Sequence, residues 1–275
     1  MTVPADAVPF PARRPAVAPL PRQRPDPMAA ELAAELALQR HVTLELQRAI
    51  LPLHDEPFDL PGLRAMVRYL PASAASRLGG DWYITAEMPT GQVLLAIGDV
   101  AGHGLPAAAG MARLRGALAG LSITGAPPRQ LVGWLNDLVR FVAPEHTASV
   151  IAGYFDPPTG QLTWSQAGHP PPVLVRGGIA AELPQPAGIM LGAGELPYDT
   201  ESVRLLPGDM LLMYSDGLIE RRDHSLDDDG LARLLAAAAS AADNPDRAIA
   251  AVLGAMGSGA EDDTCLVAVQ VTGES

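Results

Sequence analysis

The chain has 275 residues, enough for one large domain or two small ones with a sizeable buried core. Its 31 acidic and 19 basic residues give a net charge of −12, which argues against nucleic acid or an anionic membrane as the main partner, because both reward clustered Lys and Arg. The single cysteine, Cys265, excludes an internal disulfide framework. No apolar run approaches the roughly 18 residues of a membrane helix, and the N-terminus lacks the apolar core of a signal peptide. We therefore expect a cytoplasmic protein.

The N-terminal part divides into two segments before the main domain. Residues 1–27 are rich in proline and alanine and predict a disordered or polyproline-like tail. Residues 28–51 contain neither Gly nor Pro, and their leucines recur at helical spacing, which predicts an amphipathic linker helix that ends before Pro52. The apolar stripe of this helix is covered either by its own domain or by a partner, including a second copy of the chain. We expect residues 52–275 to form one domain.

That domain is predicted to alternate between groups of strands and pairs of helices. Residues 52–61 are expected to form a loop. Strands are expected over residues 62–70, 81–84, 92–99, 147–155, 161–166, 173–176, 201–206, 210–214 and 265–271, and helices over residues 105–121, 129–142, 226–242 and 245–256.

A predicted hairpin brings two aspartates together. Gly79 and Gly80 precede Asp81, and glycines at such a position let the backbone approach another group closely. Asp81 begins one strand and Asp99 ends the returning strand, so antiparallel pairing places both carboxylates at the same end of the sheet. Because two nearby carboxylates repel each other, this pair indicates a cation between them.

Further aspartates lie where apolar strands meet loops. The run Met210–Tyr214 predicts a strand buried on both faces, and Asp216 follows it in a Ser-Asp-Gly turn. Asp262 and Asp263 lead into the last strand. Hard divalent cations such as Mg²⁺ and Mn²⁺ prefer carboxylate oxygens. The chain has no P-loop, no GxSxG elbow and no Cys/His set with zinc spacing, so the pattern predicts a carboxylate cluster at one edge of the sheets.

Five motifs, in the order GGDWY, GDVAGHGLPAA, AGHPPP, LPGDMLLMYSDGLIERRD and EDDTCLVAV, resemble the bacterial PP2C-type (PPM) serine/threonine phosphatases of the SpoIIE/RsbU class. The resemblance covers about residues 45–272. It implies an α/β (α+β) fold, a four-layer α/β-β/α sandwich in which two antiparallel sheets face each other between helix pairs. The order of the predicted elements agrees with this fold but does not give its topology.

The resemblance also implies an activity and roles for the residues that match the motifs. The activity is hydrolysis of phosphoserine or phosphothreonine by a water that two Mn²⁺ or Mg²⁺ ions activate. The substrate would be a phosphorylated anti-sigma-factor antagonist with a STAS-like fold, in a partner-switching pathway. Asp99 would bridge the two ions, and Asp81 and the backbone carbonyl of Val100 would add oxygens to one of them. The other ion would be bound near the last strands, by Asp216, Asp262 and, as the less favoured choice, Asp263.

Four more residues leave alternatives open. His103, in a Gly-His-Gly turn, either donates a proton to the leaving serine oxygen or only shapes the turn, and Arg77 is a candidate phosphate contact. His169, in the AGHPPP loop, is interpreted as structural rather than as a ligand. Ile84 stands where the family usually has an acidic residue after the aromatic pair. This departure motivates an alternative function, a pseudophosphatase that binds a phosphoprotein; a small-molecule phosphoesterase is a third hypothesis.

The helix predicted to begin at Leu105 is joined to Asp99 by a turn of five residues. We hypothesise that whatever moves this helix, including the segment 28–51, also moves Asp99.

Overall fold

The structure is a computed structural model. It describes residues 28, 31, 34–35, 37–38, 50–52, 54–70, 79–142, 146–219, 229–241, 243–257 and 263–273. The chain divides into two compact units, Met1–Leu38 and Gln39–Ser275. The described residues of the first unit are helical, whereas the predicted tail and most of the segment 28–51 lie outside the described residues. Within the described part of the chain, no helix is long and apolar enough to span a membrane.

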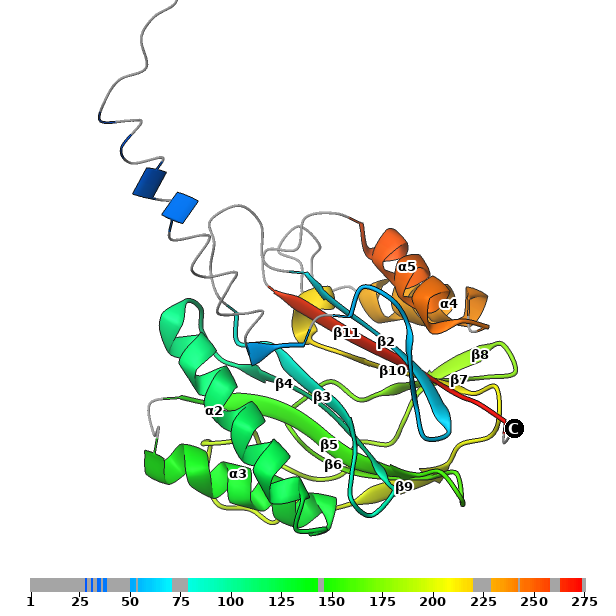
Figure 1. The fold of residues 1–275 in the computed structure, drawn as a ribbon, viewed down its shortest axis with the longest axis horizontal. Coiled ribbons are helices and arrows are strands. Elements are labelled where there is room, and N and C mark those ends of the chain that lie inside the picture. Colours follow the sequence, from blue (N-terminus) through cyan, green and yellow to red (C-terminus); the bar gives the residue numbers. More distant parts are fainter. Residues whose placement is uncertain are drawn as a thin grey trace, which may run out of the picture. The chain divides into compact units, whose positions relative to one another are not determined.

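The second unit is built on two antiparallel sheets (Figure 1). One has six strands in the order β1-β2-β11-β10-β7-β8, and the other has five in the order β3-β4-β5-β6-β9. The strands are β1 Phe58–Leu60, β2 Leu63–Leu70, β3 Trp82–Glu87, β4 Val93–Val100, β5 Ala148–Asp156, β6 Gln161–Ala167, β7 Val173–Arg176, β8 Ile179–Glu182, β9 Glu201–Arg204, β10 Met210–Tyr214 and β11 Thr264–Val271.

Helix pairs cover the outer faces of the two sheets (Figure 1). The pair α2 and α3 packs on the five-stranded sheet, and the pair α4 and α5 packs on the six-stranded sheet. The helices are α2 Leu105–Ser122, α3 Pro128–Val142, α4 Asp229–Ser240 and α5 Pro245–Met256, and a short 3-10 turn, η1 Asp216–Leu218, follows β10. This layer order confirms the predicted four-layer fold class.

Alternation along the strands separates two hydrophobic clusters. Successive side chains of a strand point to opposite faces, so on β2 the side chain of Val67 joins the cluster that includes Ile97, whereas Met66 joins the cluster under α4 and α5. The strand β10 is buried along its whole length, as its uninterrupted apolar sequence predicted. The sandwich is therefore held by apolar burial on both faces of its central strands.

The structure differs from the predicted elements at two short strands. Residues 52–61 were expected to form a loop, but Phe58–Leu60 forms the edge strand β1, paired with β2. The strand β8 was not predicted; it pairs with β7 across the turn at Gly177 and Gly178. Both strands are short and lie at sheet edges, where the partner strand rather than the local sequence decides the conformation.

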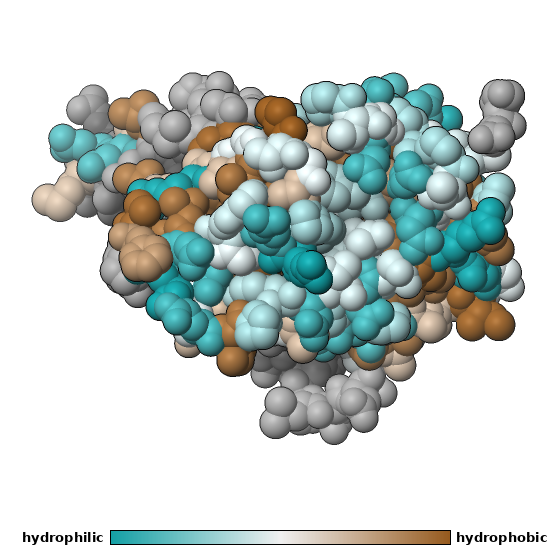
Figure 2. Space-filling view, turned by 90° about the horizontal axis from the view of Figure 1, so that it is seen from below, coloured by the Kyte–Doolittle hydropathy of each residue, from teal (hydrophilic) through white to brown (hydrophobic). Residues whose placement is uncertain are grey.

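Figure 2 shows the face of the molecule that lies underneath in the view of Figure 1. This face is mostly polar, with separate apolar patches. Exposed large apolar side chains in the second unit include Leu105, Ile123, Phe141, Val142 and Leu196. Single exposed apolar side chains are normal on soluble proteins and carry no conclusion about function.

Candidate metal centre

The predicted hairpin exists and brings Asp81 opposite Asp99. The strands β3 and β4 pair antiparallel with Trp82 opposite Gly98, so the next position places Asp81 beside Asp99. The backbone N–H of Val100 donates to the carbonyl of Gly80 at 3.2 Å, which continues the pairing beyond the strand. Asp81 is buried, with an exposed fraction of 2%. The expected placement of these two carboxylates is confirmed.

The glycine pair before Asp81 lies against oxygen atoms. A Cβ on Gly80 would lie 2.0 Å from the Val100 carbonyl oxygen and 2.5 Å from Asp99 Oδ1. A Cβ on Gly79 would lie 1.2 Å from Oδ2 of Asp263. Any other residue at either position would displace these oxygens, so the glycines make room for a group of oxygen donors.

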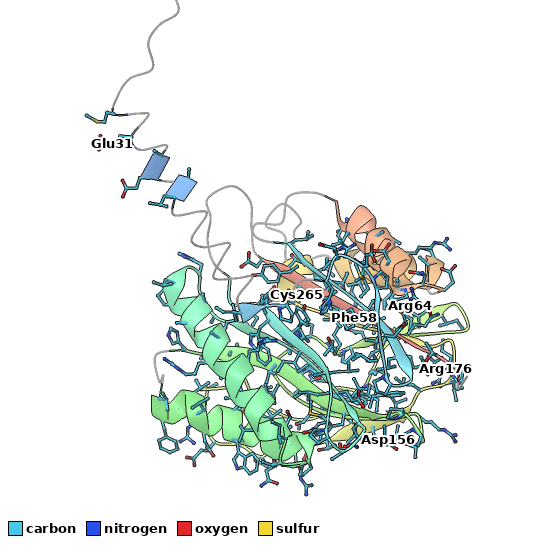
Figure 3. All side chains as sticks on the ribbon, viewed as in Figure 1. Glu31, Phe58, Arg64, Asp156, Arg176 and Cys265 are labelled. Atoms are coloured by element: carbon cyan, nitrogen blue, oxygen red, sulfur yellow. The ribbon has the colours of Figure 1, made fainter. Side chains whose placement is uncertain are left out.

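The six-stranded sheet contributes residues that follow β10 and precede β11. Ser215, fully buried, donates its hydroxyl to Asp81 Oδ2 at 2.6 Å and accepts the backbone N–H of Cys265 at 2.9 Å. This chain of hydrogen bonds joins the two sheets at the end where the aspartates gather. Cys265 marks that end in Figure 3, and Asp156 and Arg176 lie toward the other end. Ser215 was not singled out from the sequence, although it stands in the same Ser-Asp-Gly turn as Asp216.

The negative charges of three other aspartates act on the Asp81 carboxylate. Burial raises the pKa of Asp81 well above its ordinary value, and the negative charge of Asp99 raises it further. The hydrogen bond from Ser215 lowers it, and the charges of Asp263 and Asp216 add to the rise. Asp81 therefore lies within electrostatic range of Asp99, Asp216 and Asp263, and Asp99 is its neighbour across the hairpin.

Asp263 lies against Gly79, two residues before Asp81, and belongs to the six-stranded sheet side of the site. It is 4% exposed and immediately precedes β11. Burial raises the pKa of Tyr69, and the charge of Asp263 and a hydrogen bond with its side chain raise it further. Asp262, which the resemblance favoured as a ligand, lies outside the described residues. Its role stays a prediction.

The remaining candidates differ in their placement. His103 is exposed in the turn before α2, and Arg77 lies outside the described residues. Ile84 is 5% exposed and pairs with Ala96 in the core. Because side chains alternate along β3, Ile84 points to the face opposite Asp81. The departure at Ile84 is therefore a change in packing and not in the site.

The described donors suit a hard cation by their chemistry. Among the described residues, no three Asp, Glu, His or Cys side chains converge closely enough to hold an ion by themselves. The predicted set also includes Asp262, which lies outside the described residues, and the Val100 carbonyl, which is not a side chain. The described donors include the Val100 carbonyl and Asp99 Oδ1, which lie against Gly80, and Asp263 Oδ2, which lies against Gly79. Oxygen donors with room for water are the environment that Mg²⁺ and Mn²⁺ prefer, so the residues fit these ions.

A family model described as Stage II sporulation protein E (SpoIIE) matches residues 89–272, which is more than half of the chain. The chain belongs to the SpoIIE family. This confirms the resemblance to the PP2C-type phosphatases of the SpoIIE/RsbU class that the motifs indicated. The matched SpoIIE region contains Asp99, Asp216 and the pair Asp262 and Asp263, whereas Asp81 precedes it.

Known members and neighbours agree with this assignment. The phosphoserine phosphatase RsbU of Bacillus subtilis (strain 168) is 29% identical over 152 residues, which are 54% of this chain and 45% of that protein. The chain thus spans less than half the length of this curated relative. The RsbU and RsbW domains of Rv1364c from Mycobacterium tuberculosis superpose with a TM-score of 0.72 at 32% identity, covering 78% of this chain and 62% of that chain.

A more distant neighbour is the catalytic domain of the serine/threonine protein phosphatase PstP, whose structure contains two manganese ions. It superposes with a TM-score of 0.52 at 19% identity and covers 77% of this chain and 99% of that chain. At this identity the likeness shows the fold alone.

Proposed function

We propose that this member of the SpoIIE family is a metal-dependent phosphatase that hydrolyses phosphoserine or phosphothreonine in a protein. The observation that supports the proposal most is the group of carboxylates that the two sheets bring together around the Ser215–Asp81 hydrogen bond. Such a group repels itself unless a cation is present, and Gly80 lets the Val100 carbonyl and Asp99 Oδ1 lie close to the backbone there. The phosphoserine phosphatase activity in the name of the relative RsbU supports the reaction class.

Two overlapping sets of residues in this chain would bind the two ions. Asp99, Asp81 and the Val100 carbonyl would hold one ion, with Asp99 shared by the second. Asp216 and Asp262 would complete the binding of the second ion. When bound, two divalent ions supply an activated water and neutralise phosphate charge. Ser215 would keep the Asp81 carboxylate oriented by donating its hydroxyl hydrogen bond.

The substrate that we propose is a phosphorylated anti-sigma-factor antagonist with a STAS-like fold. The likeness to RsbU and to a chain that combines RsbU and RsbW domains supports a place in a partner-switching pathway. The alternative of a pseudophosphatase that only binds a phosphoprotein was motivated in part by Ile84. That residue is a core residue on the face of β3 opposite Asp81, so its identity gives no reason to expect loss of activity.

Metal removal tests the proposed reaction. After treatment with EDTA, we expect phosphate release from a phosphoserine peptide and from p-nitrophenyl phosphate to fall to background, because the carboxylates cannot activate water by themselves. Addition of Mn²⁺ or Mg²⁺ should restore the rate on both substrates. A full rate in the presence of the chelator would contradict the proposal. Restored hydrolysis of p-nitrophenyl phosphate alone would favour a small-molecule phosphoesterase.

We further propose that the segment 28–51 transmits regulatory input, from a partner or a second copy, to this site. Leu51 at its end is fully buried, and the hydroxyl of Tyr83 donates to the carbonyl of Pro52. The carbonyl of Tyr83 in turn accepts from Arg115 Nε on α2 at 3.1 Å. The end of the segment is therefore connected both to β3, which follows Asp81, and to α2, which follows Asp99.

Deletion of residues 1–44 checks this connection. We expect the Mn²⁺ affinity or the turnover number to change by about fivefold or more, which is the lower range of coupling between linked sites. Titration calorimetry with Mn²⁺ and a phosphatase assay would measure the two quantities. Deletion of residues 1–27 alone is the control and should leave both unchanged. If the longer deletion also leaves both unchanged, the segment does not regulate the site.

A further inference from the structure

His169 is buried between the two sheets although no role in the reaction needs it. It follows β6 in the AGHPPP loop and is 1% exposed. Its Nδ1 lies 2.7 Å from the hydroxyl of Ser149, and its backbone carbonyl accepts from Gln166 Nε2 at 3.2 Å. Gly168, with a φ of 64°, permits the turn that places the ring there. A ring held in this way has a fixed orientation toward β5.

Ser149 connects this ring to the candidate metal centre. It is 8% exposed, and it is the direct cross-strand partner of Asp99 in the pairing of β4 with β5. Directly opposed residues project to the same face of a sheet, with Cβ atoms about 5 Å apart. The serine hydroxyl that meets the imidazole therefore belongs to the side chain next to the carboxylate that is expected to bridge the ions.

The surroundings of His169 exclude direct contact with a substrate. A ring that is 1% exposed cannot donate a proton to a phosphoprotein. Burial also lowers the pKa of His169 to about 3, so the ring is neutral near pH 7. Its Nε2 has no hydrogen-bond partner of normal geometry among the described residues, and the Tyr214 backbone only partly offsets the fall in pKa. The contact with Ser149 is thus the main polar interaction of the ring.

We propose that His169 and Ser149 are positioning residues that hold Asp99 in place for binding divalent cations. The inference rests on the proposed function, because it assigns a support to one of the ligands named there. His169 fixes the Ser149 side chain, and Ser149 fixes the space on one side of the Asp99 carboxylate. Residues that orient metal ligands in this way typically change metal affinity by 10- to 100-fold when they are replaced.

The experiment compares two buried serines of the same sheet. Ser149→Ala removes the hydroxyl that meets His169. Ser165→Ala removes a hydroxyl that is also buried, has no hydrogen-bond partner among the described residues and lies on the opposite face. Mn²⁺ titration calorimetry should give a dissociation constant about tenfold higher for Ser149→Ala and an unchanged one for Ser165→Ala. Ser149→Thr keeps the hydroxyl and should restore the affinity. His169→Gln should weaken Mn²⁺ binding in the same way as Ser149→Ala.

The possible results distinguish a failure of the positioning role from a failure of the proposed metal centre. If Ser149→Ala binds Mn²⁺ within twofold of the wild type, the positioning role is wrong, even if the variant melts at a lower temperature. If Ser149→Ala weakens Mn²⁺ binding but His169→Gln does not, the imidazole has no part in positioning Asp99. Asp99→Asn, measured alongside, tests the proposed function itself: normal Mn²⁺ binding by that variant would overturn the metal centre and not only its support.

Discussion

Replacement of Asp99 by Asn is expected to lower Mn²⁺-dependent hydrolysis of p-nitrophenyl phosphate by about a thousandfold. Asparagine keeps the shape of the side chain and one oxygen but loses the negative charge that a bridging ligand supplies to two cations. A thousandfold corresponds to about 4 kcal/mol of transition-state stabilisation, which is within the range that a metal clamp on a phosphoryl group contributes. The measurement is the turnover number at saturating Mn²⁺, with circular dichroism to show that the variant folds.

The control is an aspartate at the other end of the same sheet. Asp156, labelled in Figure 3, ends β5 at its junction with a turn. Its carboxylate contacts Thr159 in that turn. Asp156→Asn should leave the turnover number unchanged. Equal rates for Asp99→Asn and the wild type would contradict the two-metal assignment. If the variant is inactive but still captures a phosphoprotein, that phosphoprotein identifies the substrate and tests the proposed STAS-like class.

The sequence predicts those parts of the fold that local pattern controls. The limits of β10 follow directly from an apolar run between turns, and α3 follows from its helical spacing. The edge strand Phe58–Leu60 is absent from the pattern, because it has three residues and stands close to Pro57 and Pro61. The order of strands within each sheet comes from pairings such as β2 with β11, which are distant in sequence. Only the family resemblance indicated that arrangement.

The site shows the same division between local and distant information. Asp81 and Asp99 could be placed side by side from the sequence because a short hairpin joins them. The hydrogen bond from Ser215 to Asp81 joins residues that are 134 positions apart and depends on how the two sheets face each other. The contact of His169 with Ser149 likewise depends on a loop that folds back over β5. Neither contact can be predicted from the spacing of residues in the sequence.

Asp81 and Asp209 are two buried aspartates for which substitution by Asn is expected to have opposite effects on stability. In EDTA, Asp81→Asn should raise the free energy of unfolding by about 1–2 kcal/mol, in the range of other stabilising substitutions. Burial and the charge of Asp99 disfavour the Asp81 carboxylate, whereas the neutral amide retains an oxygen that can accept from Ser215. Asp209→Asn should lower the free energy of unfolding by about 2 kcal/mol, because the carboxylate is paired.

The structure explains this difference by what faces each carboxylate. Asp209 Oδ2 accepts from Arg176 Nε at 3.0 Å, from Arg176 Nη2 at 2.6 Å and from the backbone N–H of Leu206 at 2.8 Å. Its negative charge is therefore compensated within the chain, and loss of the charge weakens these bonds. Asp81 accepts from Ser215 but is repelled by the charges of Asp99, Asp263 and Asp216, so we expect a bound cation to compensate the rest of its charge.

Urea denaturation with and without Mn²⁺ measures both effects. Excess Mn²⁺ should stabilise the wild type and Asp209→Asn, because an ion that binds only the folded chain adds to its stability, and it should stabilise Asp81→Asn much less. If Asp81→Asn destabilises the metal-free chain as much as Asp209→Asn does, Asp81 is a structural residue. A gain in stability without metal, together with a loss of the response to metal, would mean that the chain keeps this carboxylate for binding cations at the cost of its own stability.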